Sequence, residues 1–191
     1  MARSISPPKT IRLLLDQGFP KPPGFDPKSV YPSLDWVHLY DWRRDLSEIS
    51  TPDWVLYCEA AAVGFTAIVT RDFTQAEQAE EMVALSHLRD FHVIAWRERM
   101  DDPIAEWGQL LAYLPKLSKY IAQQDSKVIL LPVPTLSTKN IENPKTHIAT
   151  IADGRGQSIR QVRHEALASM ADWEQLHHLP GRYTATLRQR R

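Results

Sequence analysis

The sequence has one cysteine, no long apolar run and no excess of charge of either sign. A single thiol, Cys58, excludes an internal disulfide and a multi-thiolate zinc site, so we expect a reducing compartment. No apolar run approaches the roughly 20 residues of a membrane span, and residues 1–8 lack the apolar core of a signal peptide. Because 23 basic residues oppose 23 acidic ones, nucleic-acid binding through bulk charge is also excluded. These absences predict a cytoplasmic protein without membrane contact.

The residues that are present have the balance of a globular domain. Hydrophobic residues make up 43% of the chain and charged residues 24%, which excludes wholesale disorder, a collagen-like fibre and a coiled coil. A chain of 191 residues can build one sizeable core.

Short apolar segments alternate with amphipathic ones over the first two thirds of the chain. Their lengths predict strands at 11–15, 36–40, 67–70, 91–96 and 128–131, and helices at about 52–63, 75–88 and 104–121. Strands that alternate with helices imply right-handed crossovers. We therefore predict the α/β class, with a mainly parallel twisted sheet of about five strands and helices on both faces.

Proline, glycine and capping residues predict where some of these elements end. Five prolines and one glycine fall within residues 20–32, and they predict an irregular loop. Thr51 followed by Pro52 predicts a helix with Thr51 as its N-cap, and Gly64 predicts its end. Pro115 is expected to kink or divide the helix over 104–121.

The pattern changes after Pro134, so we divide the chain into a domain at 1–134 and a C-terminal extension at 135–191. The extension is predicted to contain a polar loop at 138–144, a strand at 147–151 and an amphipathic helix at 157–176. It ends in a basic tail, Arg188–Arg191, which is either a solubilising tail or an RNA-contacting arm.

Three aspartates fall at the ends of predicted elements. Asp16 closes the first strand, Asp72 follows the third, and Asp53 opens the helix that leads into the third. In an open parallel sheet the ligand site lies beyond the carboxyl ends of the strands, where the strand order reverses. Three converging carboxylates repel one another unless a cation neutralises them, and such a site suits a hard divalent ion.

Each aspartate also has a purely structural interpretation. Asp53 could be a charge at a helix start, and Asp72 could be the N-cap of the next helix. Asp16 is harder to explain in this way, because a carboxylate at the end of a buried strand needs a partner or a cation.

The order of these segments resembles a known family. Leu13 to Pro20 reads LLLDQGFP; Val37-His38-Leu39, then STPD at residues 50–53 with Ala60-Ala61, and AIVTRDF at residues 67–73 follow. Over roughly residues 11–131 this is similar to the PIN-like domains whose first strand runs into Asp-Glu-Asn-Leu-Pro. Thr70-Arg71-Asp72 after a β-branched strand is the most specific part.

The resemblance implies a metal-dependent endoribonuclease, often the toxin of a toxin-antitoxin pair. By this family pattern Asp16, Asp53 and Asp72 would be the catalytic residues and would hold Mg²⁺ or Mn²⁺, and a metal-activated water would cleave RNA by in-line displacement. Glu59 or Glu77 could supply a fourth oxygen ligand.

Two positions depart from the family pattern. Gln17-Gly18 replaces Glu-Asn, and Thr74 stands where a further acidic residue is expected. Three carboxylates can hold one cation, so these departures weigh against two-metal chemistry. They also keep a second hypothesis open, a catalytically inactive PIN-like binding module or regulatory scaffold.

A nuclease also needs cations for the phosphate backbone of its substrate. Arg71, Arg43 and Arg44 are the candidate nucleic-acid-binding residues. Their structural alternative is surface pairing with Asp41, Asp45 or Glu48. The expected partners are RNA and a cognate antitoxin or other protein, and the C-terminal helix could also dimerise the chain.

Overall fold

The computed structural model describes residues 10–47, 51–96, 102–121, 125–131 and 141–189. The strands are β1 (Ile11–Leu15), β2 (Leu34–His38), β3 (Ala67–Thr70), β4 (His92–Trp96), β5 (Val128–Leu131) and β6 (Ile141–Glu142). The α-helices are α1 (Pro27–Val30), α2 (Leu39–Trp42), α3 (Asp53–Ala62), α4 (Ala79–His87), α5 (Pro103–Ile121), α6 (Pro144–Arg155), α7 (Ile159–Leu176) and α8 (Thr184–Gln189). Two 3₁₀ helices complete them, η1 (Arg44–Ser47) and η2 (Phe73–Glu77). None of the described helices combines the length and apolar character of a membrane span.

The strands form one sheet in the order β2-β1-β3-β4-β5-β6. The first five are parallel and β6 pairs antiparallel with β5. This confirms the predicted α/β class and the mainly parallel sheet. Because β1 lies between β2 and β3, the strand order reverses at β1, and the ends of β1 and β3 meet at the position where such sheets bind ligands.

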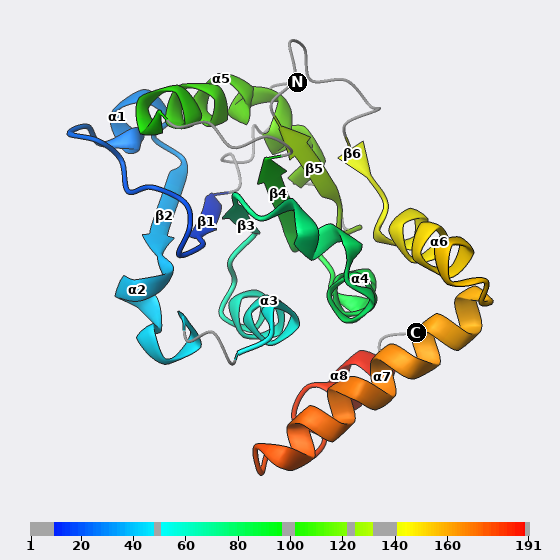
Figure 1. The fold of residues 1–191 in the computed structure, drawn as a ribbon. Helices are drawn as coiled ribbons and strands as arrows, with labels where there is room; N and C mark the ends of the chain where they lie inside the picture. The colour runs from blue at the N-terminus through cyan, green and yellow to red at the C-terminus, as the bar shows by residue number, and fades with distance from the viewer. Residues whose placement is uncertain (1–9, 48–50, 97–101, 122–124, 132–140, 190–191) are drawn as a thin grey trace, which may run out of the picture.

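Helices cover both faces of the sheet (Figure 1). On one face α5 packs Trp107, Leu110 and Leu114 against strand side chains such as Leu13 and Val69. β1 and β3 are buried on both faces except at partly exposed Arg12, which is why each is a mainly apolar run in the sequence.

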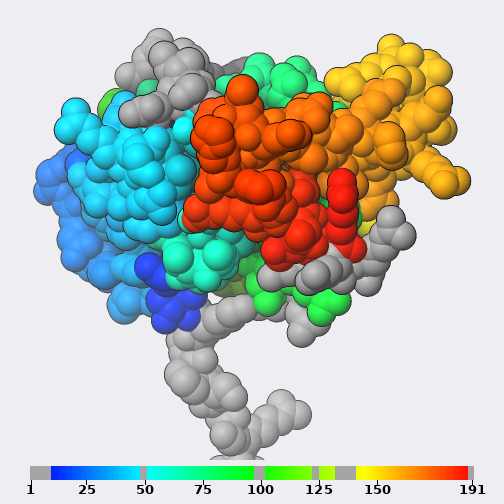
Figure 2. All heavy atoms as spheres, turned by 90° about the horizontal axis from the view of Figure 1, so that it is seen from below, coloured from blue at the N-terminus to red at the C-terminus, as the bar shows by residue number. Residues whose placement is uncertain are grey.

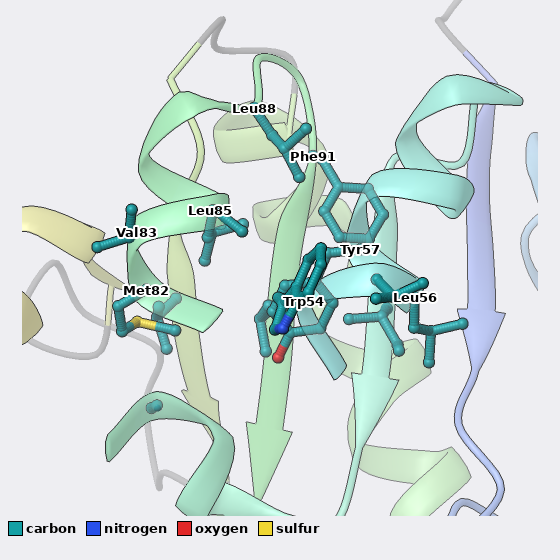
Figure 3. Packing of buried hydrophobic residues seen from close by; sticks show 14 of the residues in the cluster. Trp54, Leu56, Tyr57, Met82, Val83, Leu85, Leu88 and Phe91 are labelled. Atoms are coloured by element: carbon teal, nitrogen blue, oxygen red, sulfur yellow. The ribbon is translucent and has the colours of Figure 1, made fainter. Parts of the chain in front are cut away.

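The other face carries α3 and α4, whose apolar side chains interlock over the sheet (Figure 3). Trp54 and Tyr57 from α3 lie against Leu85 and Leu88 of the α4 segment, with Phe91 beside the Tyr57 ring. Beyond them lie α7 and α8, which extend across the lower side of the molecule (Figure 2).

The C-terminal helices share this second core with residues of the N-terminal part. Met170 and Val162 of α7 and Leu187 of α8 are buried in the same cluster as Leu14 of β1. The Trp54 ring meets the rings of Trp173 and Tyr183 edge-on, at centroid distances of 5.4 and 5.6 Å. The extension therefore packs directly against α3 and α4.

Several predicted boundaries were wrong. Residues 147–151 are not a strand but part of α6. This helix begins at Pro144, and its N-cap is Asn143, whose side chain accepts a hydrogen bond from Lys145 N. Pro52 rather than Thr51 is the N-cap of α3, and no side chain caps it. Pro115 lies inside α5 without dividing it. The helix expected at 75–88 begins as η2 and continues as α4.

Other details match the expectations only in part. The strand expected at 36–40 is β2, displaced by two residues. The loop between β1 and β2 is irregular apart from α1. Gly64 follows the end of α3 with a φ of +84°, a conformation that favours glycine. Residues 138–140, Arg190 and Arg191 lie outside the described residues.

Candidate functional site

Asp16 directly follows β1 and is held firmly by two hydrogen bonds. Its Oδ1 accepts from Gln17 N at 2.7 Å, and its Oδ2 accepts from the Thr70 hydroxyl at 2.8 Å. The residue is 7% exposed. Burial raises its pKa, opposed by the two hydrogen bonds and by His38, and reinforced by the negative charge of Asp72. The need for a partner inferred from the sequence is thus met in part by Thr70.

Asp53 is the first residue of α3, where the helix dipole favours a carboxylate. Its carboxylate has no hydrogen-bond or ion-pair partner among the described residues. Burial raises its pKa to about 7, and the charges of Asp16 and Asp72 add to the effect. Asp53 is therefore a helix-start charge that also faces the other two aspartates.

Asp72 has the capping role that its structural interpretation proposed. Its Oδ1 accepts from Thr74 N at 2.9 Å and from the Thr74 hydroxyl at 2.6 Å, at the start of η2. Thr74 thus binds the aspartate in place of a further acid. Asp72 is exposed, and its charge reaches both Asp16 and Asp53.

A fourth carboxylate belongs to this group and was not predicted from the sequence. Glu81 of α4 is 8% exposed, and its Oε2 has no hydrogen-bond partner among the described residues. Burial raises its pKa to about 8, opposed by a backbone hydrogen bond and reinforced by the charges of Asp53, Glu80 and Asp72.

A cavity of about 160 Å³ lies between the first two aspartates. Asp16 and Asp53 line it together with Gln17, Ser47, Thr51 and Leu39. The hollow is large enough for a few waters or a hydrated cation, and far too small for a nucleotide. A substrate would therefore have to lie over its mouth.

The two glutamates proposed as fourth ligands lie elsewhere. Glu59 accepts from the Arg182 guanidinium and from the Tyr183 hydroxyl at 2.7 Å, and with them it lines a separate cavity of about 910 Å³. Six residues of helix carry it about 9 Å from Asp53 along α3, and its carboxylate contacts Arg182 and Tyr183. Glu77 is exposed on η2, and no interaction joins it to the other acids in the described part of the chain.

The predicted basic residues are mostly engaged. Arg71 Nε donates to Glu106 at 3.0 Å, and Glu106 is completely buried on α5. Arg43 binds both oxygens of Asp45 and lies 3.6 Å from Glu59, as its structural alternative expected. Arg44 is exposed on η1, two residues before the cavity-lining Leu46. Glu48, the other acid weighed as a partner, lies outside the described residues.

The four carboxylates influence one another electrostatically, but they are not arranged as a ready metal-binding site. Among the described residues, no three Asp, Glu, His or Cys side chains are arranged closely enough to hold a metal ion as they stand. Their chemistry nevertheless fits a hard divalent cation: all the donors are carboxylate oxygens, and one oxygen of buried Glu81 has no partner in the part of the chain that the structure describes. Cation binding would therefore require some of these side chains to change rotamer.

The raised pKa of Asp53 predicts a measurable pH dependence of the free energy of unfolding. The pKa of Asp53 is about 7 in the folded protein and near 3.8 when unfolded, so stability should fall as the pH rises between these values. Asp53→Asn should therefore stabilise the metal-free protein at pH 8 by on the order of 2–4 kcal/mol. Urea unfolding at pH 4 and pH 8 measures this. At pH 4 the two proteins should be nearly equal, and a difference independent of pH would refute the coupling.

Comparison with known proteins gave no match to a family model, a curated protein or a solved structure. The function has to be inferred from the chemistry of the site and from the residues that carry the family resemblance.

Proposed function

We propose that the chain is a divalent-cation-dependent endoribonuclease with a PIN-like active site. One observation carries the proposal. Asp16, Asp53, Asp72 and Glu81 come from four separate segments. The charges of Asp16 and Asp72 act on Asp53, and those of Asp53 and Asp72 act on Glu81. Asp16 and Asp72 follow the two strands at which the strand order reverses. The carboxylates of Asp16 and Asp72 accept hydrogen bonds that also stabilise the fold. Neither Asp53 nor Glu81 has a cationic partner in the described part of the chain.

Accumulated, uncompensated negative charge is costly, and a bound cation removes this cost. Asp16, Asp53 and Glu81 would hold Mg²⁺ or Mn²⁺, with Asp72 beside them at the exposed rim. When bound, such an ion activates water and stabilises negative charge on a phosphodiester. The protein's own part is to fix Asp16 through Thr70 and Gln17 and to keep Asp53 at the rim of the cavity.

An RNA phosphodiester as substrate follows from the resemblance of residues 11–131 to PIN-like domains. Exposed Arg44 beside the cavity could contact the phosphate backbone, and Arg43 could do so if it left Asp45. Arg71 is less available for this role, because it neutralises buried Glu106. A protein partner that covers the exposed Asp72 rim would restrain the activity.

A cleavage assay with a matched variant tests the proposal. The purified protein should cut a labelled single-stranded RNA with Mn²⁺ or Mg²⁺ and should not cut it in EDTA. Asp72→Asn should reduce cleavage strongly while Asp90→Asn, an aspartate at the α4–β4 turn, should cut at the wild-type rate. Cleavage that survives EDTA, or no cleavage with either ion, would refute the metal-dependent nuclease. Equal cleavage by the wild type and Asp72→Asn would exclude Asp72 from the site.

A specific observation also favours a second candidate, a non-catalytic binding module. The carboxylates do not form a ready metal cage among the described residues, and one of the three predicted phosphate contacts is committed to Glu106. Calorimetric titration with Mn²⁺ separates the two, because an inactive scaffold should show no carboxylate-dependent binding.

A further inference from the structure

The hydroxyl of Thr70 joins the two strand-end aspartates. Thr70 is the last residue of β3 and is completely buried. Its Oγ1 lies 2.8 Å from Asp16 Oδ2, 3.0 Å from Asp72 N and 3.4 Å from Gln75 Nε2. Thr70 Oγ1 therefore contacts both the carboxylate that follows β1 and the turn that carries Asp72.

The direction of each hydrogen bond follows from the donors. A backbone N–H can only donate, so Thr70 Oγ1 accepts from Asp72 N. The Tyr57 hydroxyl donates to Gln75 Oε1 at 2.8 Å, which leaves the Gln75 amide to donate to Thr70. The single proton of Thr70 is then directed at Asp16 Oδ2. A buried chain of donors thus runs from Tyr57 through Gln75 and Thr70 and ends on Asp16.

This arrangement fixes the orientation of the Asp16 side chain. Both of its oxygens accept a hydrogen bond, so the group cannot turn without breaking one of them. Each carboxylate oxygen has a second lone pair, so the hydrogen bonds orient the group without using its capacity to bind an ion. In proteins, partners that orient a metal ligand in this way typically contribute 10- to 100-fold to metal affinity or activity.

A second observation indicates that the orientation serves a ligand. Glu81 contributes a carboxylate that is nine-tenths buried and has an unpaired oxygen among the described residues, and its charge acts on Asp53 and Asp72. An unpaired oxygen on a buried carboxylate is costly, and a bound cation would remove that cost.

We propose that Thr70 is the positioning residue of the acidic site: its hydroxyl fixes Asp16 and the Asp72 turn relative to each other so that one divalent cation can bind between β1 and β3. The inference rests on the proposed function. It assigns to Thr70 a role in cation affinity that is separate from its contribution to stability.

Thr66 provides a matched control on the same segment. It precedes β3, is 5% exposed, and its hydroxyl donates to Arg12 O at 2.9 Å and accepts from Arg12 N at 3.0 Å. Thr66→Val therefore removes a similar hydroxyl, with two bonds to the β1 segment, at the opposite end of the strand from the acids. A purely structural role of Thr70 would give the two valine variants the same phenotype.

The experiment is calorimetric titration of Mn²⁺ into the full chain, with urea unfolding of each variant. Thr70→Val should weaken Mn²⁺ binding by about 10- to 100-fold. Thr70→Ser, which keeps the hydroxyl, should stay within about threefold of the wild type. Thr66→Val should lose stability but bind Mn²⁺ as the wild type does. Thr70→Ala replaces Thr70→Val if the valine variant does not fold.

The outcomes separate the two claims. If the wild type binds no Mn²⁺, the proposed function fails. If the wild type binds Mn²⁺ and Thr70→Val binds it equally well, the inference about Thr70 is overturned while the function stands. Equal losses of affinity in Thr70→Val and Thr66→Val would also overturn it, because the effect would then be structural.

Discussion

Asp16→Asn should reduce Mn²⁺-dependent RNA cleavage by about 10³-fold or more, because a metal ion contributes several kcal/mol to the stabilisation of such a transition state. Asparagine is nearly isosteric, and its one oxygen can still accept from Gln17 N, while its amide nitrogen takes the place of the oxygen that accepts from the Thr70 hydroxyl. Urea unfolding of the variant checks that the fold is retained. The variant loses the negative charge that a divalent ion requires. The initial rate of cleavage of a labelled RNA at saturating Mn²⁺ measures the loss.

Asp41→Asn is the matched control for that substitution. Asp41 is exposed and pairs with Lys21, away from the acidic site. We expect this variant to cleave RNA at the wild-type rate. If Asp16→Asn also retained the wild-type rate while folding normally, Asp16 would not be a catalytic residue.

Glu174→Ala should destabilise the protein by about 3–5 kcal/mol. Glu174 of α7 is 1% exposed, and it accepts from the backbone N–H groups of Gly181, Tyr183 and Thr184 and from the Thr184 hydroxyl. Alanine would leave these donors without this acceptor, and those of Tyr183 and Thr184 are buried. The free energy of unfolding in urea measures the loss.

Glu165→Ala is the control on the same helix. Glu165 is exposed and accepts only from the Gln157 side chain among the described contacts, so its loss should change stability by less than about 0.5 kcal/mol. Because α7 and α8 share a core with β1 and α3, unfolding of Glu174→Ala should remain one cooperative transition. Equal stability of the two alanine variants would show that the turn before α8 contributes little.

The central sheet could be predicted from sequence because its strands are short apolar runs. Apart from partly exposed Arg12, Ile11–Leu15 and Ala67–Thr70 are buried on both faces, so their apolar residues stand out in the sequence. The segment at 147–151 misled the prediction, because Ile148, Thr150 and Ile151 favour a strand locally. The helix start at Asn143-Pro144 and the packing of Ile148 against the α4 face decide the outcome instead.

The acidic site could be predicted only in outline. Asp16 and Asp72 follow neighbouring strands, and parallel strands bring their ends together. Glu81 was missed because an acidic pair at a helix start normally serves the helix dipole. A signal was present, since Ala79 and Met82 to Leu85 make α4 apolar on nearly every side. Glu81 lies among these apolar residues and is buried, whereas Glu80 beside it is partly exposed.

Bound Mn²⁺ located by its anomalous scattering in crystals of the wild-type protein tests most directly whether the acidic residues share one cation. We expect a peak between the carboxylates of Asp16 and Asp53, with Glu81 or Asp72 turned toward it. Well-ordered crystals in millimolar Mn²⁺ with no peak at these carboxylates, or with the only peak elsewhere, would contradict the account.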